Sequence, residues 1–131
     1  QVMQVNINGP IWMTQALLPL LQQSEDASVI FTSSSVGRKG RAYWGAYSVS
    51  KFATEGFVDV LADELNNQSH IRVNSLNPGA TRTQMRRTAF PGEDPFTLRT
   101  PEEIMPTYLW LMGPDSTGTS GQKLDAQPPR T

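Results

Sequence analysis

The amino-acid sequence predicts an α/β fold in which helices cover a parallel sheet. Short apolar runs that suit buried strands alternate with longer segments whose apolar residues recur every three or four positions, as in amphipathic helices. The expected order is helix, strand, helix, strand, loop, helix, strand. Such alternation is typical of right-handed crossovers that join parallel strands. The 131 residues suit one domain, spanning 1–131.

Three helices are expected. The first covers about residues 2–23, with a kink near its start, where Asn, Gly and Pro interrupt the apolar pattern. The second covers about residues 46–67 and places its apolar side chains along one side. The third begins after Thr100, a suitable N-cap before a proline and two acidic residues, and runs to about Met112.

Three strands are expected between these helices. Residues 28–33 and 71–76 are short apolar runs, and a third, shorter strand covers about residues 121–126. Residues 83–100 are rich in Thr, Arg, Pro and Gly and show no period, so we expect a long loop there. Loops of this length inside compact domains are usually functional lids or disordered segments.

Composition excludes several classes of partner. The net charge is −1, so the general basic footprint of a nucleic-acid-binding protein is missing. No apolar run approaches the roughly 20 residues that span a bilayer. Cysteine is absent, which excludes disulfides. We therefore expect neither a nucleic acid nor a membrane as a partner.

Ser34, Tyr47 and Lys51 are the residues whose spacing points to chemistry. Tyr47 and Lys51 are four positions apart at the head of the second helix, so their side chains share one helix face. Ser34 follows the first strand, and parallel sheets present strand ends and helix starts at a common ligand-binding edge. A hydroxyl, a phenol and an ammonium gathered there would form a proton-donating site for a carbonyl oxygen.

Other interpretations of the same residues are weaker. A Tyr-x-x-x-Lys pair taken alone is more often an ordinary helix-surface pair. Ser48 and Lys51 also match the Ser-x-x-Lys motif of penicillin-binding enzymes, but the Ser-Asp-Asn and Lys-Thr-Gly motifs of that class do not occur. No Gly-x-Ser-x-Gly elbow or cluster of metal ligands is present, so we expect no metal. The basic cluster at residues 38–41 is interpreted as a solvated turn, or else as a contact for a phosphorylated cofactor or an acidic substrate.

Four motifs, in order and spacing, resemble the second half of a short-chain dehydrogenase/reductase. They are Asn6 in the first helix, Ser34 with Gly37 three residues later, Tyr47 with Lys51, and the Pro-Gly segment of residues 77–83. The resemblance runs from about residue 5 to residue 126. It implies the C-terminal part of a Rossmann-type doubly wound sheet, about three strands with flanking helices. It also implies a cytoplasmic, NAD- or NADP-dependent oxidoreductase that acts on a small carbonyl compound or secondary alcohol.

The resemblance assigns roles to the catalytic residues. Tyr47 would donate its proton to the substrate carbonyl oxygen, or accept one from the alcohol in the reverse direction. Lys51 would lower the pKa of Tyr47 and hydrogen-bond the nicotinamide ribose, so both residues also belong to the cofactor site. Ser34 would hold the substrate oxygen. Asn6 would hold a water that relays protons to Lys51.

The resemblance also assigns a cofactor loop to the segment after the second strand. Its expected residues are Pro78, Gly79, Thr81 and Thr83, with the backbone near Gly79 and the hydroxyl of Thr83 facing the nicotinamide carboxamide. The long loop after it, with residues 38–44, would line the substrate pocket. The family's usual Val-Asp-Gly-Gly ending is replaced here by residues 124–127, Leu-Asp-Ala-Gln. This difference changes the expected packing of the C-terminal tail.

The family's glycine-rich cofactor turn does not occur in the sequence. We therefore interpret the chain as a partial domain in which the N-terminal strands are missing, inactive by itself and catalytic within a longer protein. NAD and NADP are both left open. Relatives of this type pair their two long helices into homodimers or homotetramers. The alternative is a non-catalytic fragment that keeps the fold and the oligomer contacts but binds no cofactor.

Overall fold

The three expected strands form one parallel sheet. The structure, a computed structural model, describes residues 1–68 and 70–128. Strands β1 (Ala27–Thr32), β2 (Ile71–Asn77) and β3 (Lys123–Asp125) pair in the order β1-β2-β3. All pairs are parallel, with Ala27 opposite Ile71 at the start of the β1–β2 register. The predicted α/β class and parallel sheet are therefore confirmed.

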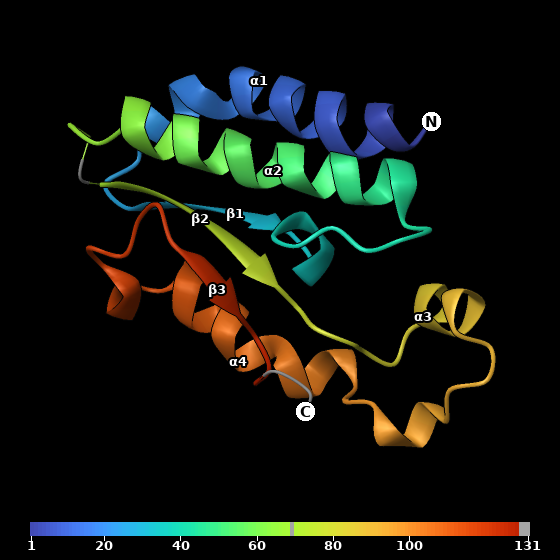
Figure 1. The fold of residues 1–131 in the computed structure, drawn as a ribbon. Helices are drawn as coiled ribbons and strands as arrows, with labels where there is room; N and C mark the ends of the chain where they lie inside the picture. Colours follow the sequence, from blue (N-terminus) through green and yellow to red (C-terminus); the bar gives the residue numbers. More distant parts are fainter. Residues whose placement is uncertain (69, 129–131) are drawn as a thin grey trace.

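The two long helices lie side by side on one face of this sheet (Figure 1). Helix α1 (Gly9–Gln23) follows a π-helical turn at Gln4–Asn8, and α2 (Gly45–Glu64) follows β1. The irregularity expected near the start of the first helix is thus a π-helical turn, one of the usual causes of a local kink.

The main core lies between these helices and the sheet. Alternate residues of β1 and β2 face α2, as the two-residue period of a strand requires. The buried residues of this core are Ala27, Phe31, Val58, Leu61, Leu65, Ile71 and Val73. The rings of Phe31 and Phe57 meet edge to face, with centroids 5.4 Å apart.

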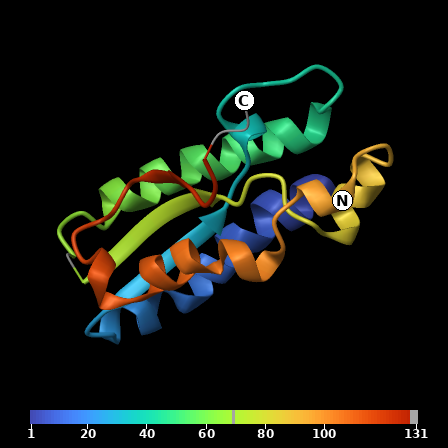
Figure 2. The ribbon, with the colours of Figure 1, turned by 90° about the horizontal axis from the view of Figure 1, so that it is seen from below.

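Helix α4 (Pro101–Met112) covers the opposite face of the sheet (Figure 2). It begins as predicted, with a capping box in which Thr100 and Glu103 satisfy each other's backbone N–H groups. The Ser28 hydroxyl donates to the Leu111 carbonyl at 2.6 Å and ties β1 to the end of α4. The sheet is therefore covered on both faces, as in doubly wound folds.

The segment expected as a loop at residues 83–100 contains regular structure. It holds helix α3 (Gln84–Ala89) and a 3-10 turn at Pro95–Thr97, so that expectation is wrong in part. The cause is local capping, because the Thr83 side chain accepts a hydrogen bond from the Arg86 N–H at 3.1 Å. We call residues 82–99 the lid. Its ends are joined, since the Arg82 N–H donates to the Arg99 carbonyl at 2.8 Å.

The carboxyl ends of β1 and β2 lie at the same end of the molecule as the start of α2 (Figure 1). The arrowheads of β1 and β2 point toward the end at which α2 begins, and α3 lies at that end too (Figure 1). Among residues 1–68 and 70–128, no helix combines the length and apolar character needed to cross a bilayer.

Candidate functional site

Ser34 lies in a tight turn that packs directly on α2. β1 ends at Thr32, and Ser34 then caps the 3-10 turn Ser35–Gly37, its hydroxyl oxygen accepting the Val36 N–H at 3.4 Å. A Cβ atom on Gly37 would lie 2.8 Å from the backbone and Cβ of Lys51. Glycine is needed here for close approach to α2, and this contact brings the Ser34 turn to the helix segment that carries Lys51.

Tyr47 and Lys51 share a face in the first turns of α2. The Lys51 ammonium lies 5.7 Å from the centroid of the Tyr47 ring. The same ammonium donates to the carbonyl of Thr32 at 2.8 Å, two residues before Ser34. The structure therefore brings the three residues predicted from spacing to one edge of the sheet. Tyr47 and Lys51 are both half-buried.

Burial changes the acidity of Lys51. Desolvation lowers the pKa of its ammonium below the ordinary lysine value, and the nearby Glu55 carboxylate raises the pKa in part opposition. Glu55 follows Lys51 by one helical turn and is 4% exposed. A cation so placed stabilises negative charge on a neighbouring phenolate, because the charge interaction is stronger away from bulk water.

Asn6 contacts the same helix through Ser50. Its side-chain amide donates to the Ser50 hydroxyl at 3.1 Å, and that hydroxyl donates to the Tyr47 carbonyl at 2.7 Å. Asn6 is thus held between the positions of Tyr47 and Lys51 along α2. Its role in a proton relay stays a prediction.

The expected cofactor loop follows β2 at the same edge. Gly79 has φ +75°, a left-handed conformation that favours glycine. The Asn77 side chain accepts the Gly79 N–H at 3.1 Å, and the Thr81 hydroxyl donates to the Gly79 carbonyl at 3.2 Å. Thr81 is buried, whereas Thr83 is exposed and caps α3. Pro78 opens the loop, and its carbonyl is engaged by the C-terminal segment.

Gln127 holds this loop from the side. Its side-chain amide donates to the carbonyls of Pro78, at 2.8 Å, and Ala80, at 3.1 Å. A Cβ on Gly79 would lie 3.1 Å from the Gln127 amide nitrogen, so the two residues are packed closely. The departure from the family's usual ending therefore places a glutamine against the expected cofactor loop.

The interpretation of Arg38 as part of a solvated turn is wrong. Its guanidinium donates to Glu55 at 3.2 Å, to both oxygens of Asp125 at 3.0 and 3.1 Å, and to the Leu124 carbonyl at 2.8 Å. Glu55 also accepts the Ser75 hydroxyl at 2.7 Å. We call Arg38, Glu55 and Asp125 the charged tie. It links the loop after the Ser34 turn to α2 and β3.

Asp125 extends the charged tie to the cofactor loop. The Asn77 amide donates to Asp125 at 2.7 Å, which turns the Asn77 oxygen toward the Gly79 N–H. A carboxylate only accepts hydrogen bonds, so it fixes the orientation of the amide. A continuous set of polar contacts therefore runs from the loop after Ser34 to the loop at Gly79.

Two aromatic side chains lie beside Tyr47. They come from residues 38–44 and from the lid, which were expected to line the substrate pocket, but neither was assigned a role as a catalytic or cofactor residue. The rings of Trp44 and Tyr47 have centroids 5.7 Å apart, and those of Trp44 and Phe90 lie 5.8 Å apart. Trp44 lies just before the helix that carries Tyr47, so proximity in sequence was a usable signal. Phe90 belongs to the lid, and no local feature of the sequence indicates that its ring lies near Trp44. In the described part of the chain, no group of three or more His, Cys, Asp or Glu residues is placed to hold a metal.

Comparison with known proteins identifies the family of this chain. The chain matches the short chain dehydrogenase family over residues 1–94. It is 63% identical over 129 residues to the Escherichia coli K12 protein YciK, an uncharacterized oxidoreductase, covering 98% of this chain and 50% of the relative. The chain thus spans half the length of that relative.

Solved structures of relatives have the same fold. That of YciK from E. coli superposes with a TM-score of 0.92 at 63% identity, over 96% of this chain and 51% of the other. A chain from Escherichia coli CFT073, solved in complex with NADPH, superposes with a TM-score of 0.92 at 63% identity, over 96% and 52%. Sequence and fold agree over nearly all of this chain, which therefore belongs to the short-chain dehydrogenase family.

Proposed function

We propose that this chain carries the catalytic residues of an NADP-dependent oxidoreductase that reduces a small carbonyl compound or oxidises a secondary alcohol. One observation supports the proposal above others. The Lys51 ammonium lies 5.7 Å from the Tyr47 ring centroid and 2.8 Å from the carbonyl of Thr32, next to the Ser34 turn, at the open edge of a parallel sheet. Ligands bind at this edge in open α/β sheets.

The chain fits the nicotinamide end of the cofactor. Lys51 offers a cation, and the loop that turns at Gly79 lies at the same edge. The glycine-rich turn that would hold the pyrophosphate does not occur in this sequence. The relative YciK is about twice as long as this chain. We therefore assign the glycine-rich turn to a second half, and we use the term complete protein for this chain together with that half. Relatives solved with NADPH and with NADP favour NADP as the cofactor.

Residues of this chain would transfer the proton and stabilise the charge that develops. Bound NADPH supplies the hydride. Tyr47 is the proton donor to the carbonyl oxygen, and the Lys51 charge stabilises the phenolate that remains. The Ser34 hydroxyl donates a hydrogen bond to the same oxygen as negative charge develops on it. Asn6 and Ser50 hold the helix segment between Tyr47 and Lys51, through hydrogen bonds of 3.1 and 2.7 Å. Pro78, Gly79, Thr81 and Thr83 form the wall for the nicotinamide.

The outer faces of α1 and α2 support an oligomer. Large apolar side chains are exposed along both helices, and such patches mark interfaces between proteins. They are Trp12, Met13, Leu17, Leu20, Val49, Phe52 and Val60. We assign them to the contacts of a homodimer or homotetramer of the complete protein.

A variant series in the complete protein tests this function. Tyr47→Phe is expected to lower turnover of a carbonyl substrate by about 100-fold or more, because it removes the proton donor. The affinity for NADPH, followed by its fluorescence, is expected to stay within about twofold of the parent. Tyr108→Phe is the matched control, since Tyr108 lies on α4, which covers the face of the sheet opposite to α2 (Figure 2). Retained turnover in Tyr47→Phe would overturn the proton-donor role.

NADPH titrations of the 131-residue chain alone and of the complete protein together distinguish the catalytic interpretation from the non-catalytic one, because the chain alone is expected to bind no NADPH in either case. Without the glycine-rich turn, the proposal expects no saturable binding at micromolar NADPH. A complete protein that also fails to bind NADPH would favour the non-catalytic alternative.

A further inference from the structure

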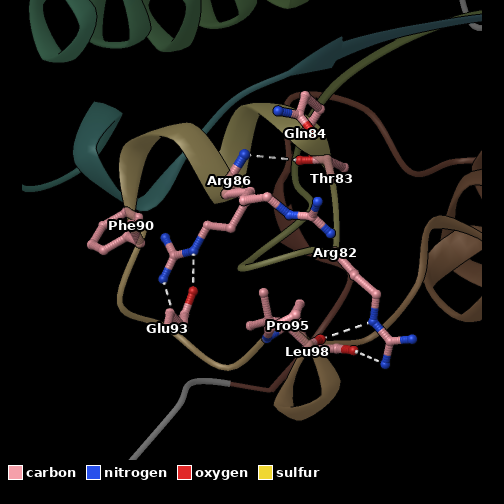
Figure 3. Close-up of a pocket in the computed structure, with 9 residues that line it drawn as sticks. Arg82, Thr83, Gln84, Arg86, Phe90, Glu93, Pro95 and Leu98 are labelled. Atoms are coloured by element: carbon pink, nitrogen blue, oxygen red, sulfur yellow. Dashed lines mark hydrogen bonds and ion pairs between the residues drawn. The ribbon is translucent and has the colours of Figure 1, made fainter.

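The residues of the lid line an open pocket of about 270 Å³ (Figure 3). Its walls combine apolar side chains with charged ones. Phe90, Pro95 and Leu98 provide the apolar part, and Arg82, Arg86, Arg87 and Glu93 provide the charges. Small-molecule sites are usually concave and combine an apolar lining with a few convergent polar groups. This pocket has an apolar part, but more of its lining residues are polar or charged than is usual.

The pocket has an excess of positive charge. Arg82 donates to the carbonyls of Pro95 and Leu98 at 2.8 and 2.9 Å. These partners are neutral, so the Arg82 charge is not cancelled. Arg87 forms no ion pair within the described residues and is exposed on α3. One carboxylate and three guanidiniums line the pocket, which gives a formal charge of +2 (3 − 1).

The second arginine of the pocket is held rigidly. Arg86 binds both oxygens of Glu93, at 2.6 and 2.9 Å, and its guanidinium lies 3.6 Å from the Phe90 ring centroid. A bidentate ion pair and a ring contact together fix the plane of a guanidinium. Arg82 is fixed as well by its two carbonyl partners. Fixed donors lose little conformational freedom when an anion binds, which increases affinity.

The pocket also borders the proposed catalytic site. Phe90 lines the pocket, and its ring contacts Trp44, whose ring contacts Tyr47. A substrate with its carbonyl at Tyr47 would therefore reach the pocket with a group on its far side, past Trp44. Arginine is the residue best suited to recognise the planar oxygens of a carboxylate or a phosphate.

From the arginines of the lid and their contact with Trp44, we infer that this pocket binds the anionic group, carboxylate or phosphate, of the substrate. The inference rests on the proposed function and narrows its substrate class to carbonyl compounds or alcohols that carry such a group. The same chemistry would also suit a phosphate of the cofactor, and the experiment below distinguishes the two sources.

The probe is inorganic phosphate, which is titrated by calorimetry into the complete protein saturated with NADPH. Titration with chloride at matched ionic strength is the reference for non-specific effects of salt. We expect phosphate to bind with a dissociation constant in roughly the millimolar range. Arg87→Gln is expected to weaken this binding about fivefold or more while NADPH affinity stays unchanged. Because Arg87 is exposed, this variant keeps the fold. Lys123→Gln, on an exposed residue of β3 outside the pocket, is the control and should change neither.

Two other outcomes overturn the inference. If phosphate displaces NADPH and Arg87→Gln weakens NADPH binding, the pocket serves the cofactor instead. If no phosphate binds, or if its binding is the same in the parent and in Arg87→Gln, the pocket is not an anion site. A protein that binds no NADPH would refute the proposed function separately, and phosphate titration without NADPH would still test the pocket.

Discussion

Gln127 is bound to Pro78 through a hydrogen bond of 2.8 Å from the side-chain amide to the backbone carbonyl, although 49 positions separate them. The same amide reaches the Ala80 carbonyl, so it spans Gly79, whose φ of +75° sets the course of the loop. Loop conformation after β2 is thus determined partly by a residue beyond β3.

Gln127→Ala should loosen the proposed cofactor loop. The variant loses the hydrogen bonds to the Pro78 and Ala80 carbonyls, each worth about 1 kcal/mol, together with a longer one to the Thr81 hydroxyl, and leaves both carbonyls to water. We expect the NADPH dissociation constant of the complete protein to rise about fivefold, measured by NADPH fluorescence. Gln122→Ala is the control, because its exposed side chain donates to the nearby Ser120 carbonyl and, among the described residues, has no hydrogen bond to the loop at Gly79. Equal NADPH affinity in both variants would contradict a role for Gln127.

Gly37→Ala should push the Ser34 turn away from α2. The new Cβ would lie 2.8 Å from backbone atoms of Lys51, so the turn or the helix has to shift. Overpacking of this kind costs about 1–3 kcal/mol. Gly40→Ala, in the following loop, meets only the Ser48 hydroxyl at 4.0 Å and should leave stability unchanged. Denaturant unfolding of both variants measures the difference, and a neutral Gly37→Ala would show that the close contact is not required.

Arg38→Gln should destabilise the protein far more than loss of a neighbouring ion pair. Glu55 is 4% exposed, and removal of Arg38 leaves this buried carboxylate without its ion-pair partner, at a cost of about 3 kcal/mol. The matched variant Lys123→Gln breaks the exposed pair to Asp59, which also joins β3 to α2. Exposed pairs contribute about 0–1 kcal/mol. Similar free energies of unfolding in the two variants would show that the charged tie has no special role.

Most of the architecture could be predicted from local sequence. Thr100 with Glu103 marked the start of α4, and apolar runs marked β1 and β2, because capping and periodicity act over a few residues. Helix α3 was missed since it depends on the Thr83 cap and on Arg86 contacts within the lid, with no apolar period to reveal it.

The same limit applies to the candidate site: contacts between residues close in sequence could be predicted, and contacts between distant residues could not. Tyr47 and Lys51 could be paired because one helical turn separates them. The partners of Arg38 could not be predicted, since Asp125 lies 87 positions away and is reached only through the sheet register. Gln127 was noted only as a departure from the family's ending, and its contact with the Pro78 loop needs the three-dimensional structure.

Glu55→Gln should shift the pH dependence of the proposed reaction. Glu55 raises the pKa of Lys51, opposing the larger lowering by burial, so removal of its charge lowers the Lys51 pKa further. Glutamine keeps an acceptor for Arg38 and a partner for Ser75. Carbonyl reduction requires the Lys51 charge, so its rate should fall as pH rises through that pKa. We therefore expect the alkaline limb of kcat/KM in the complete protein to move to lower pH in Glu55→Gln. Glu64→Gln, exposed at the end of α2, should leave the limb in place. A limb that stays fixed or moves to higher pH in Glu55→Gln would show that Lys51 does not control it.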